Sequence, residues 1–192
     1  MAPNAFGFYY LATEILPYAK GVFRFEKCDK GDIVCPSGAK YKQVDTFSSD
    51  ANWNDARAIV ESQFMSMCVD YNRKKAGALT GVAITGGASK SRAIQQAIAD
   101  ILGVPVFAAG IQTAEGVDKQ ALAMPAYGGA IRALNQLDIP LDASTKSKPD
   151  SAVSYVLQHI CRTNCNKHAV YAQALDDFEF LRDFASRTSI SS

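Results

Sequence analysis

The sequence predicts one soluble domain of the α/β class, on three observations. A short apolar run at residues 78–85 precedes two adjacent glycines, and an alanine-rich stretch with helical spacing follows them. A second apolar run then begins at residue 104. A strand, a helix and a strand in this spacing are typical of a right-handed crossover between parallel strands. The composition, 48% hydrophobic and 20% charged over 192 residues, suits a single domain with a substantial core.

The first 25 residues are aromatic and resemble strands. GFYYL and GVFRF lie on either side of Pro17, which excludes one continuous strand or helix through this region. Residues 26–52 are polar and contain glycine, so we expect a surface loop there, with room for a hairpin.

A helix is predicted over residues 52–75, with Asn54 or Asp55 as its N-cap. Apolar residues recur in it at helical spacing and predict one buried stripe, which consists of Val60, Phe64, Met67 and Tyr71. Gly77 ends this segment.

The apolar run 78–85 is expected to form the first strand of the crossover. Ser89 is expected to cap the following helix, whose inward face carries Ile94, Ala97, Ile98 and Ile101. Gly103 ends that helix, and VPVFAA at 104–109 predicts the second strand.

The remainder of the chain predicts further helices. One is opened by glycines at 127–137, and two amphipathic helices follow near 150–162 and 168–186. Residues 142–151 have the composition of a linker.

Charge and cysteine content narrow the function classes. The formal net charge is +1, so no electrostatic feature favours a nucleic acid or a membrane surface as partner. No apolar run is long enough to span a bilayer, and the N-terminal stretch has no basic leader before its apolar part. Five cysteines without disulfide-scaffold spacing indicate a reducing compartment, and we expect a cytoplasmic protein.

The glycine turn does not fit the common phosphate-binding fingerprints. Gly81 and Gly86 have the first spacing of a Walker A loop, but Gly87 stands where its lysine should be. The dinucleotide fingerprint fails as well, because GGASKS lacks its third glycine. Two residues without a Cβ atom still let a flat base approach the backbone, and the amides at the following helix N-terminus can satisfy polar ligand groups. A tight turn that binds nothing explains the pattern equally well.

Four stretches of the sequence resemble one family in order. ITGGASKSRAIQQAIADILGVPVF resembles the adenosine-binding segment of the FGGY carbohydrate kinases, specifically the xylulose kinases. GFYYLATEILPYAKGVFRF, ARAIVESQFMSM and PAYGGAIRAL resemble other segments of the same lobe, and together the four cover most of residues 6–134. The resemblance implies the C-terminal, nucleotide-binding lobe of the actin-like ATPase and ribonuclease H-like superfamily, incomplete at its N-terminal side. It divides the chain into a partial lobe at residues 1–140, a linker at 141–150, the C-terminal helices of the same lobe at 151–186 and a frayed tail at 187–192.

The activity implied by this resemblance is the phosphorylation of D-xylulose to D-xylulose 5-phosphate, with ATP and Mg²⁺. By motif position, Gly86 sets the turn, while Gly87 and Ala88 lie along the adenine. Ser91 falls where the family has an asparagine that bonds the adenine, and a serine is shorter and offers fewer contacts. The sequence also departs from the family at 110–124, which is longer, and at Pro125, which replaces a serine or threonine.

The parts of such a kinase that perform the chemistry are not recognised in this sequence. In the family the sugar site, the catalytic aspartate and one phosphate loop lie in the N-terminal lobe, and the second phosphate loop opens the C-terminal lobe. We therefore assign no catalytic residue, expect the chain to be inactive alone, and expect adenosine and ATP to bind about equally. Lys90 is then a solvated lysine beside the turn. A non-catalytic binding or interaction module derived from a sugar kinase is the alternative.

A second alternative is a zinc-binding module. Four potential zinc ligands occur within ten residues, namely His159, Cys161, Cys165 and His168. Their spacing matches no standard zinc finger or knuckle, so we assign no metal ligand.

Overall fold

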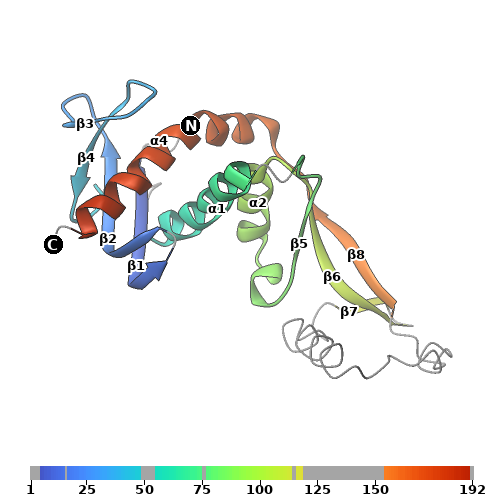
Figure 1. Cartoon of the computed structure of the whole chain (residues 1–192). Coiled ribbons are helices and arrows are strands. Elements are labelled where there is room, and N and C mark those ends of the chain that lie inside the picture. The colour runs from blue at the N-terminus through green and yellow to red at the C-terminus, as the bar shows by residue number, and fades with distance from the viewer. Residues whose placement is uncertain are drawn as a thin grey trace. The chain divides into compact units, whose positions relative to one another are not determined.

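The structure is a computed structural model, and it describes residues 5–15, 17–48, 55–74, 77–113, 116–118 and 154–190. The chain forms two compact units (Figure 1). The first unit comprises Met1–Ala78, Ala97–Gly103 and Thr163–Ser192, and the second comprises Leu79–Gln96 and Val104–Arg162. The predicted helix at 127–137 and the predicted linker lie outside the described residues. Within the described residues the predicted α/β class is confirmed.

An antiparallel sheet organises the first unit. Its strands are β1 (Ala5–Ile15), β2 (Tyr18–Lys27), β3 (Ile33–Val34) and β4 (Lys40–Val44), in the order β1-β2-β4-β3. Pro17 lies in the turn between β1 and β2. This position suits proline, because it has no amide hydrogen to donate to a neighbouring strand. The hairpin expected within residues 26–52 is confirmed by β3 and β4. The region is not only a surface loop, however, because Cys35 and Tyr41 are buried.

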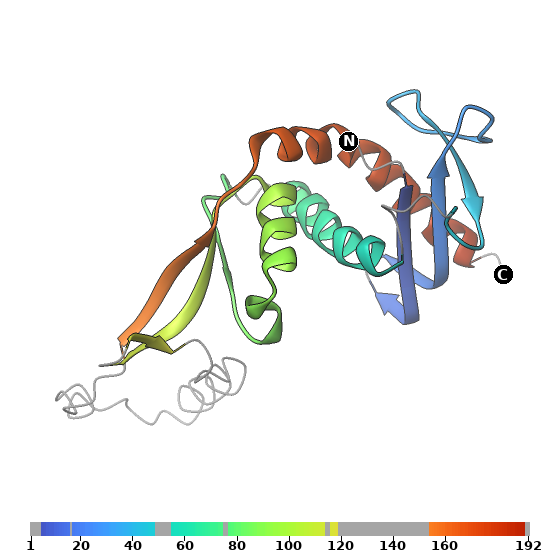
Figure 2. The same ribbon diagram turned by 180° about the vertical axis from the view of Figure 1, so that it is seen from behind.

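Two helices pack on this sheet, α1 (Asp55–Lys74) on β1 and α4 (Cys165–Ile190) mainly on β2 (Figure 2). Alternate residues of β1, Phe6 and Phe8, enter the core together because side chains two apart on a strand share a face. The ring of Phe178 in α4 meets both of them, with 5.0 Å between its centroid and that of Phe8. This aromatic cluster is the hydrophobic core of the first unit.

The buried face of α1 differs from the prediction. The helix buries Ala58, Glu61, Met65 and Val69, whereas Met67 of the predicted stripe is 54% exposed. Both stripes have helical spacing, so periodicity alone does not choose between them. The choice depends on Glu61, a residue that sequence reasoning places outside. Its carboxylate is buried because it accepts hydrogen bonds from Arg57 and Tyr171.

The predicted crossover begins and ends in the second unit, while the second half of its helix belongs to the first unit. Strand β5 (Val82–Ile84) leads through the 3₁₀ turn η1 (Gly87–Lys90) into α2 (Arg92–Leu102), and β6 (Val106–Thr113) follows. β5 and β6 are parallel, with Val82 opposite Val106, which confirms the prediction. Ile98 and Ile101 of α2 are buried as expected.

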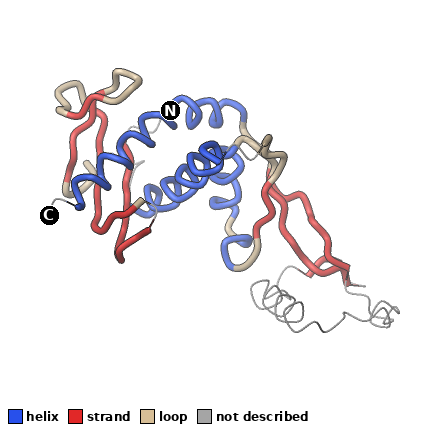
Figure 3. The backbone as a smooth tube through the Cα atoms, viewed as in Figure 1, coloured by secondary structure: helices blue, strands red, loops and turns tan. Residues whose placement is uncertain are grey.

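Two further strands complete this sheet, and one of them corrects a prediction. β7 (Gly116–Asp118) and β8 (Ser154–Cys161) both pair with β6 in antiparallel fashion, and the strands are drawn in red in Figure 3. The helix predicted near 150–162 is therefore wrong. The apolar residues of so short a segment fit the period of a helix as well as that of a strand. Pairing with β6 gives the backbone of β8 its hydrogen bonds.

The C-terminal helix confirms the second predicted helix and extends it. α4 continues to Ile190, beyond residue 187 where the frayed tail was expected to begin. The hydroxyl of Ser186 donates to the carbonyl oxygen of Tyr18 at 2.9 Å, and that of Ser189 donates to the carbonyl oxygen of Lys20 at 2.8 Å. These bonds attach the last turns to the sheet. None of the described helices is both long and apolar enough to cross a membrane.

Candidate functional site

The glycine turn is exposed and is held by bonds within its own backbone. Gly86 has a φ of +74°, a conformation that glycine adopts without a steric penalty. Its carbonyl oxygen accepts hydrogen bonds from both the amide and the hydroxyl of Ser89, at 3.1 and 2.7 Å. Thr85, Gly86 and Gly87 are exposed, so the end of β5 and the start of η1 are accessible to a ligand.

The helix after the turn is capped by Ser91 and not by Ser89. The Ser91 hydroxyl oxygen accepts a long hydrogen bond of 3.4 Å from the amide of Ile94, the N3 position of α2. The predicted cap at Ser89 is wrong because its hydroxyl bonds back to Gly86 and leaves a 3₁₀ turn before the helix. The Ser91 hydroxyl keeps its own O–H as a donor, in the position where a ligand approaching the helix N-terminus would meet it.

Space is open above the turn. A Cβ atom on Gly87 would meet no other group of the described residues within 4 Å, and the same is true of Gly86. One turn at the carboxyl end of a parallel strand thus holds all the residues that the sequence proposes to bind a nucleotide. They are Gly86, Gly87, Ala88 and Ser91. Ligands of open α/β sheets bind at this end of the strands.

A pocket of about 470 Å³ lies next to the turn within the second unit. The turn and α2 line it with Ser89, Lys90, Arg92 and Gln95, and β8 contributes Gln158, His159 and Ile160. Sequence reasoning did not find this pocket, because it assigned β8 to a helix. Only the position of Lys90 and Arg92 on either side of the helix N-cap could have indicated it.

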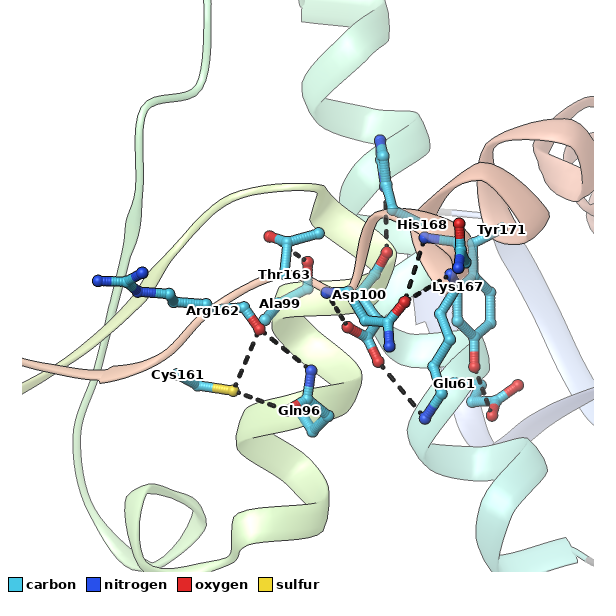
Figure 4. A network of polar contacts seen from close by, with 12 residues as sticks. Glu61, Gln96, Ala99, Asp100, Cys161, Arg162, Thr163, Lys167, His168 and Tyr171 are labelled. Atoms are coloured by element: carbon cyan, nitrogen blue, oxygen red, sulfur yellow. Dashed lines mark hydrogen bonds and ion pairs between the residues drawn. The ribbon is translucent and has the colours of Figure 1, made fainter.

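Side-chain bonds connect the turn, α2 and β8 around this pocket. The Gln95 amide donates to the carbonyl oxygen of Ser89 at 2.7 Å, and an Arg92 Nη donates to the carbonyl oxygen of Ile160 at 3.2 Å. One turn further along α2, the Gln96 amide donates to the carbonyl oxygen of Arg162, and the Cys161 thiol contacts the Gln96 oxygen at 3.1 Å (Figure 4). These contacts fix the start of α2 against the end of β8.

Three of the four residues of the proposed zinc group, His159, Cys161 and His168, have other contacts. The His159 ring packs edge-on against Phe107 of β6, and Cys161 bonds to Gln96. Cys165 is exposed at the first position of α4. Among the described residues no three His, Cys, Asp or Glu side chains are grouped so as to hold a metal ion. The zinc-binding alternative therefore finds no support.

His168 has a structural role within the first unit. Its Nδ1 lies 3.0 Å from the carbonyl oxygen of Asp100, at the end of α2 (Figure 4). The buried Asp100 carboxylate accepts the amide of Asn164 at 2.9 Å, and the Asn164 side chain in turn accepts the amides of Asn166 and Lys167 at the start of α4. This arrangement caps α4 and connects it to α2.

Two carboxylates of the first unit are occupied by structural bonds. Asp55 pairs with Arg24, whose Nε lies 2.6 Å from it, and this bond, followed by one from Tyr9, holds the pKa of Asp55 below its usual value. A carboxylate held ionised in this way is a weak general base. Asp177 is buried and accepts the amide and the hydroxyl of Ser37.

The glycine turn lies within a segment that matches a known protein family. Residues 45–117, which are less than half of the chain, match the FGGY family of carbohydrate kinases, C-terminal domain. The match includes α1, β5, the glycine turn, α2 and β6.

One solved structure is similar to the chain over a larger part of its length. It is the crystal structure of gluconate kinase from Lactobacillus acidophilus, with 18% sequence identity and a TM-score of 0.49. The similarity covers 80% of this chain and 28% of that protein, so the chain spans less than a third of the kinase's length.

Proposed function

We propose that this chain is the adenosine-binding part of an FGGY carbohydrate kinase that transfers a phosphoryl group from ATP to D-xylulose. The observation that supports this most is the exposed glycine turn at the end of β5, with open space above Gly87, inside the segment that matches the family. D-xylulose as the acceptor rests on the sequence motifs alone.

Each residue of the turn has a defined part in this proposal. Gly86 reverses the chain with a positive φ, and Gly87 leaves room for a flat base against the backbone. The first amides of α2 and the Ser91 hydroxyl then face the polar edge of the base. The adenine is thus held by shape and by a few hydrogen bonds.

The described residues do not provide a catalytic base or a carboxylate site for a metal ion. No carboxylate among them lines the adjacent pocket, so they offer no carboxylate ligand for Mg²⁺ there. We therefore derive no step through the metal and assign no catalytic base to this chain. In the proposed reaction ATP supplies the phosphoryl group, and the residues of the glycine turn bind and orient its nucleoside part.

Titration of the purified chain with adenosine tests the proposal. We expect amide NMR shifts centred on residues 85–92 and a dissociation constant near or above 1 mM, which corresponds to about 4 kcal/mol or less. The absence of adenosine-induced shifts at residues 85–92 would overturn the proposed function.

A second measurement concerns the whole reaction. In a coupled ADP-release assay with D-xylulose and Mg²⁺-ATP, we expect no sugar-dependent turnover from this chain, because no catalytic base is assigned in it. Turnover above the sugar-free blank would show that this chain holds a base and a sugar site that we have not identified.

A further inference from the structure

The pocket beside the glycine turn has a charge pattern that the adenosine site does not explain. Among the described residues seven line it, of which Lys90 and Arg92 are cations, His159 is an imidazole and none is acidic. The other four are a serine, two glutamines and Ile160, so most of the lining is polar. Its volume of about 470 Å³ falls within the range of roughly 300–1,000 Å³ found for ligand sites.

The two cations of the pocket, Lys90 and Arg92, have no acidic partner among the described residues. Lys90 is the last residue of η1 and Arg92 the first of α2, and both are exposed. The bond from Arg92 to the carbonyl oxygen of Ile160 uses one of the five guanidinium donors and holds this side chain toward β8. Two cations beside a helix N-terminus form a region of positive potential.

Gln95 adds a polar group that still needs a partner. The residue is 6% exposed, and its amide nitrogen bonds to Ser89, but its Oε1 has no hydrogen-bond partner in the part of the chain that the structure describes. Buried amide oxygens are normally hydrogen-bonded. A hydroxyl or amine group of a ligand in the pocket could satisfy this oxygen after a small movement of the side chain.

We propose that this pocket binds the phosphate group of a phosphorylated ligand, with Lys90 and Arg92 as its anchors. The lining has the cations that a phosphate requires and lacks the carboxylates that would repel it. This departs from the sequence-based expectation that the chain has no phosphate site and that Lys90 is only solvated. The phosphate can belong to a nucleotide whose base lies on the glycine turn or to a sugar phosphate, and the experiment distinguishes the two.

Titration of the full 192-residue chain with sodium pyrophosphate, followed by amide NMR, tests the phosphate site itself. We expect saturable shifts in residues 89–95 and 158–160, and weaker binding as the salt concentration rises. Lys90→Ala and Arg92→Gln should each weaken binding about tenfold, because a hydrogen bond to a charged group is worth roughly that factor. Lys42→Ala, which removes an exposed lysine of β4, should leave binding unchanged.

Three outcomes would overturn the phosphate site. The first is the absence of saturable binding, and the second is equal loss of binding in the Lys90 and Lys42 variants; the third concerns another pocket. A second pocket also contains lysines, Lys27 and Lys40. Pyrophosphate binding that is lost in a Lys27→Ala, Lys40→Ala double variant and retained in Lys90→Ala would place the site there instead and equally overturn the proposal.

Adenosine, ATP and D-xylulose 5-phosphate are then titrated in turn to identify the source of the phosphate. ATP that binds more than tenfold more tightly than both adenosine and pyrophosphate would show one nucleotide spanning the turn and the pocket. Tighter binding of the sugar phosphate than of pyrophosphate would assign the pocket to a sugar phosphate. Because pyrophosphate lacks a base and adenosine lacks a phosphate, failure of the phosphate site and failure of the proposed adenosine site give different results.

Discussion

The imidazole of His168 lies directly against Gly103, in the space that a side chain at position 103 would occupy. A Cβ atom on Gly103 would be 2.4 Å from Cε1 of His168, which is closer than real Cβ contacts come. Gly103 also has a φ of +72°, which ends α2 and directs the chain toward β6. Two independent constraints therefore require glycine at this position.

Gly103→Ala should destabilise the first unit strongly. We expect a loss of about 3 kcal/mol in the free energy of unfolding, from backbone strain and from the contact with His168 together. Urea denaturation monitored by circular dichroism measures it. Gly38→Ala is the matched control, because Gly38 has a φ of +83° and nothing within 4 Å of its Cβ position. The control should lose only about 1 kcal/mol, and equal losses in the two variants would show that the His168 contact does not matter.

Tyr171 should make the stability of the first unit depend on alkaline pH. Its hydroxyl donates to the buried Glu61 carboxylate at 2.8 Å. Burial, followed by the nearby Glu61 charge, raises the pKa of Tyr171 above its ordinary value of 10.0. The folded state therefore retains a proton that the unfolded state releases, so this contribution is complete below pH 10 and is lost as the pH rises above it.

Tyr171→Phe should accordingly flatten the loss of stability between pH 10 and pH 12, measured by urea denaturation at several pH values. At pH 7 the same variant should lose about 1 kcal/mol, since one hydrogen bond is removed while Arg57 still bonds to Glu61. Burial also raises the pKa of Tyr10, to about 12, so part of the alkaline loss should remain in the variant. A variant with the same slope as the wild type would contradict the role of Tyr171.

The reactivity of two cysteines should differ widely. Cys35 is 4% exposed, and burial, followed by the Asp177 carboxylate, raises the pKa of its thiol from 9.0 to about 12. Near pH 8 this lowers its thiolate fraction about a thousandfold relative to an ordinary cysteine. Cys165 is exposed at the start of α4. Iodoacetamide at pH 8, followed by peptide mass spectrometry, should label Cys165 quickly and Cys35 only after urea is added. Early labelling of Cys35 would show that the β3–β4 hairpin opens readily.

The sequence predicts the crossover well and the elements around it less well. β5, α2 and β6 combine strong apolar runs with glycines at both ends of the helix, so local signals and tertiary structure agree there. The segment at β8 carries no such signal, because its conformation depends on pairing with β6, a distant part of the sequence. The buried face of α1 also depends on distant residues, since the buried Glu61 accepts a hydrogen bond from Tyr171 of α4 as well as one from Arg57.

The candidate site likewise has one part that local sequence patterns predict and one part that they do not. Gly86, Gly87, Ala88 and Ser91 are found from the motif, because all four lie within six consecutive residues. The pocket beside them needs β8 in place, so its residues on that strand cannot be found from local patterns.

The glycine turn itself gives the last prediction, which concerns Gly87→Val. A Cβ atom at this position meets no atom of the described residues within 4 Å, so a valine side chain would extend into the open space above the turn. In our proposal that space belongs to the adenine. The variant should therefore fold normally, with a change in unfolding free energy within about 1 kcal/mol, and should lose the adenosine-induced NMR shifts at residues 85–92.

Gly86→Ala is the control that distinguishes filling the space above the turn from straining the turn backbone. Gly86 has a φ of +74°, so alanine there strains the turn, while its Cβ position is as open as that of Gly87. We expect Gly86→Ala to lower stability by about 1 kcal/mol and to weaken adenosine binding less than Gly87→Val does. If Gly87→Val retained the adenosine shifts in full, the base would not lie against this backbone, and the turn would have only a structural role between β5 and α2.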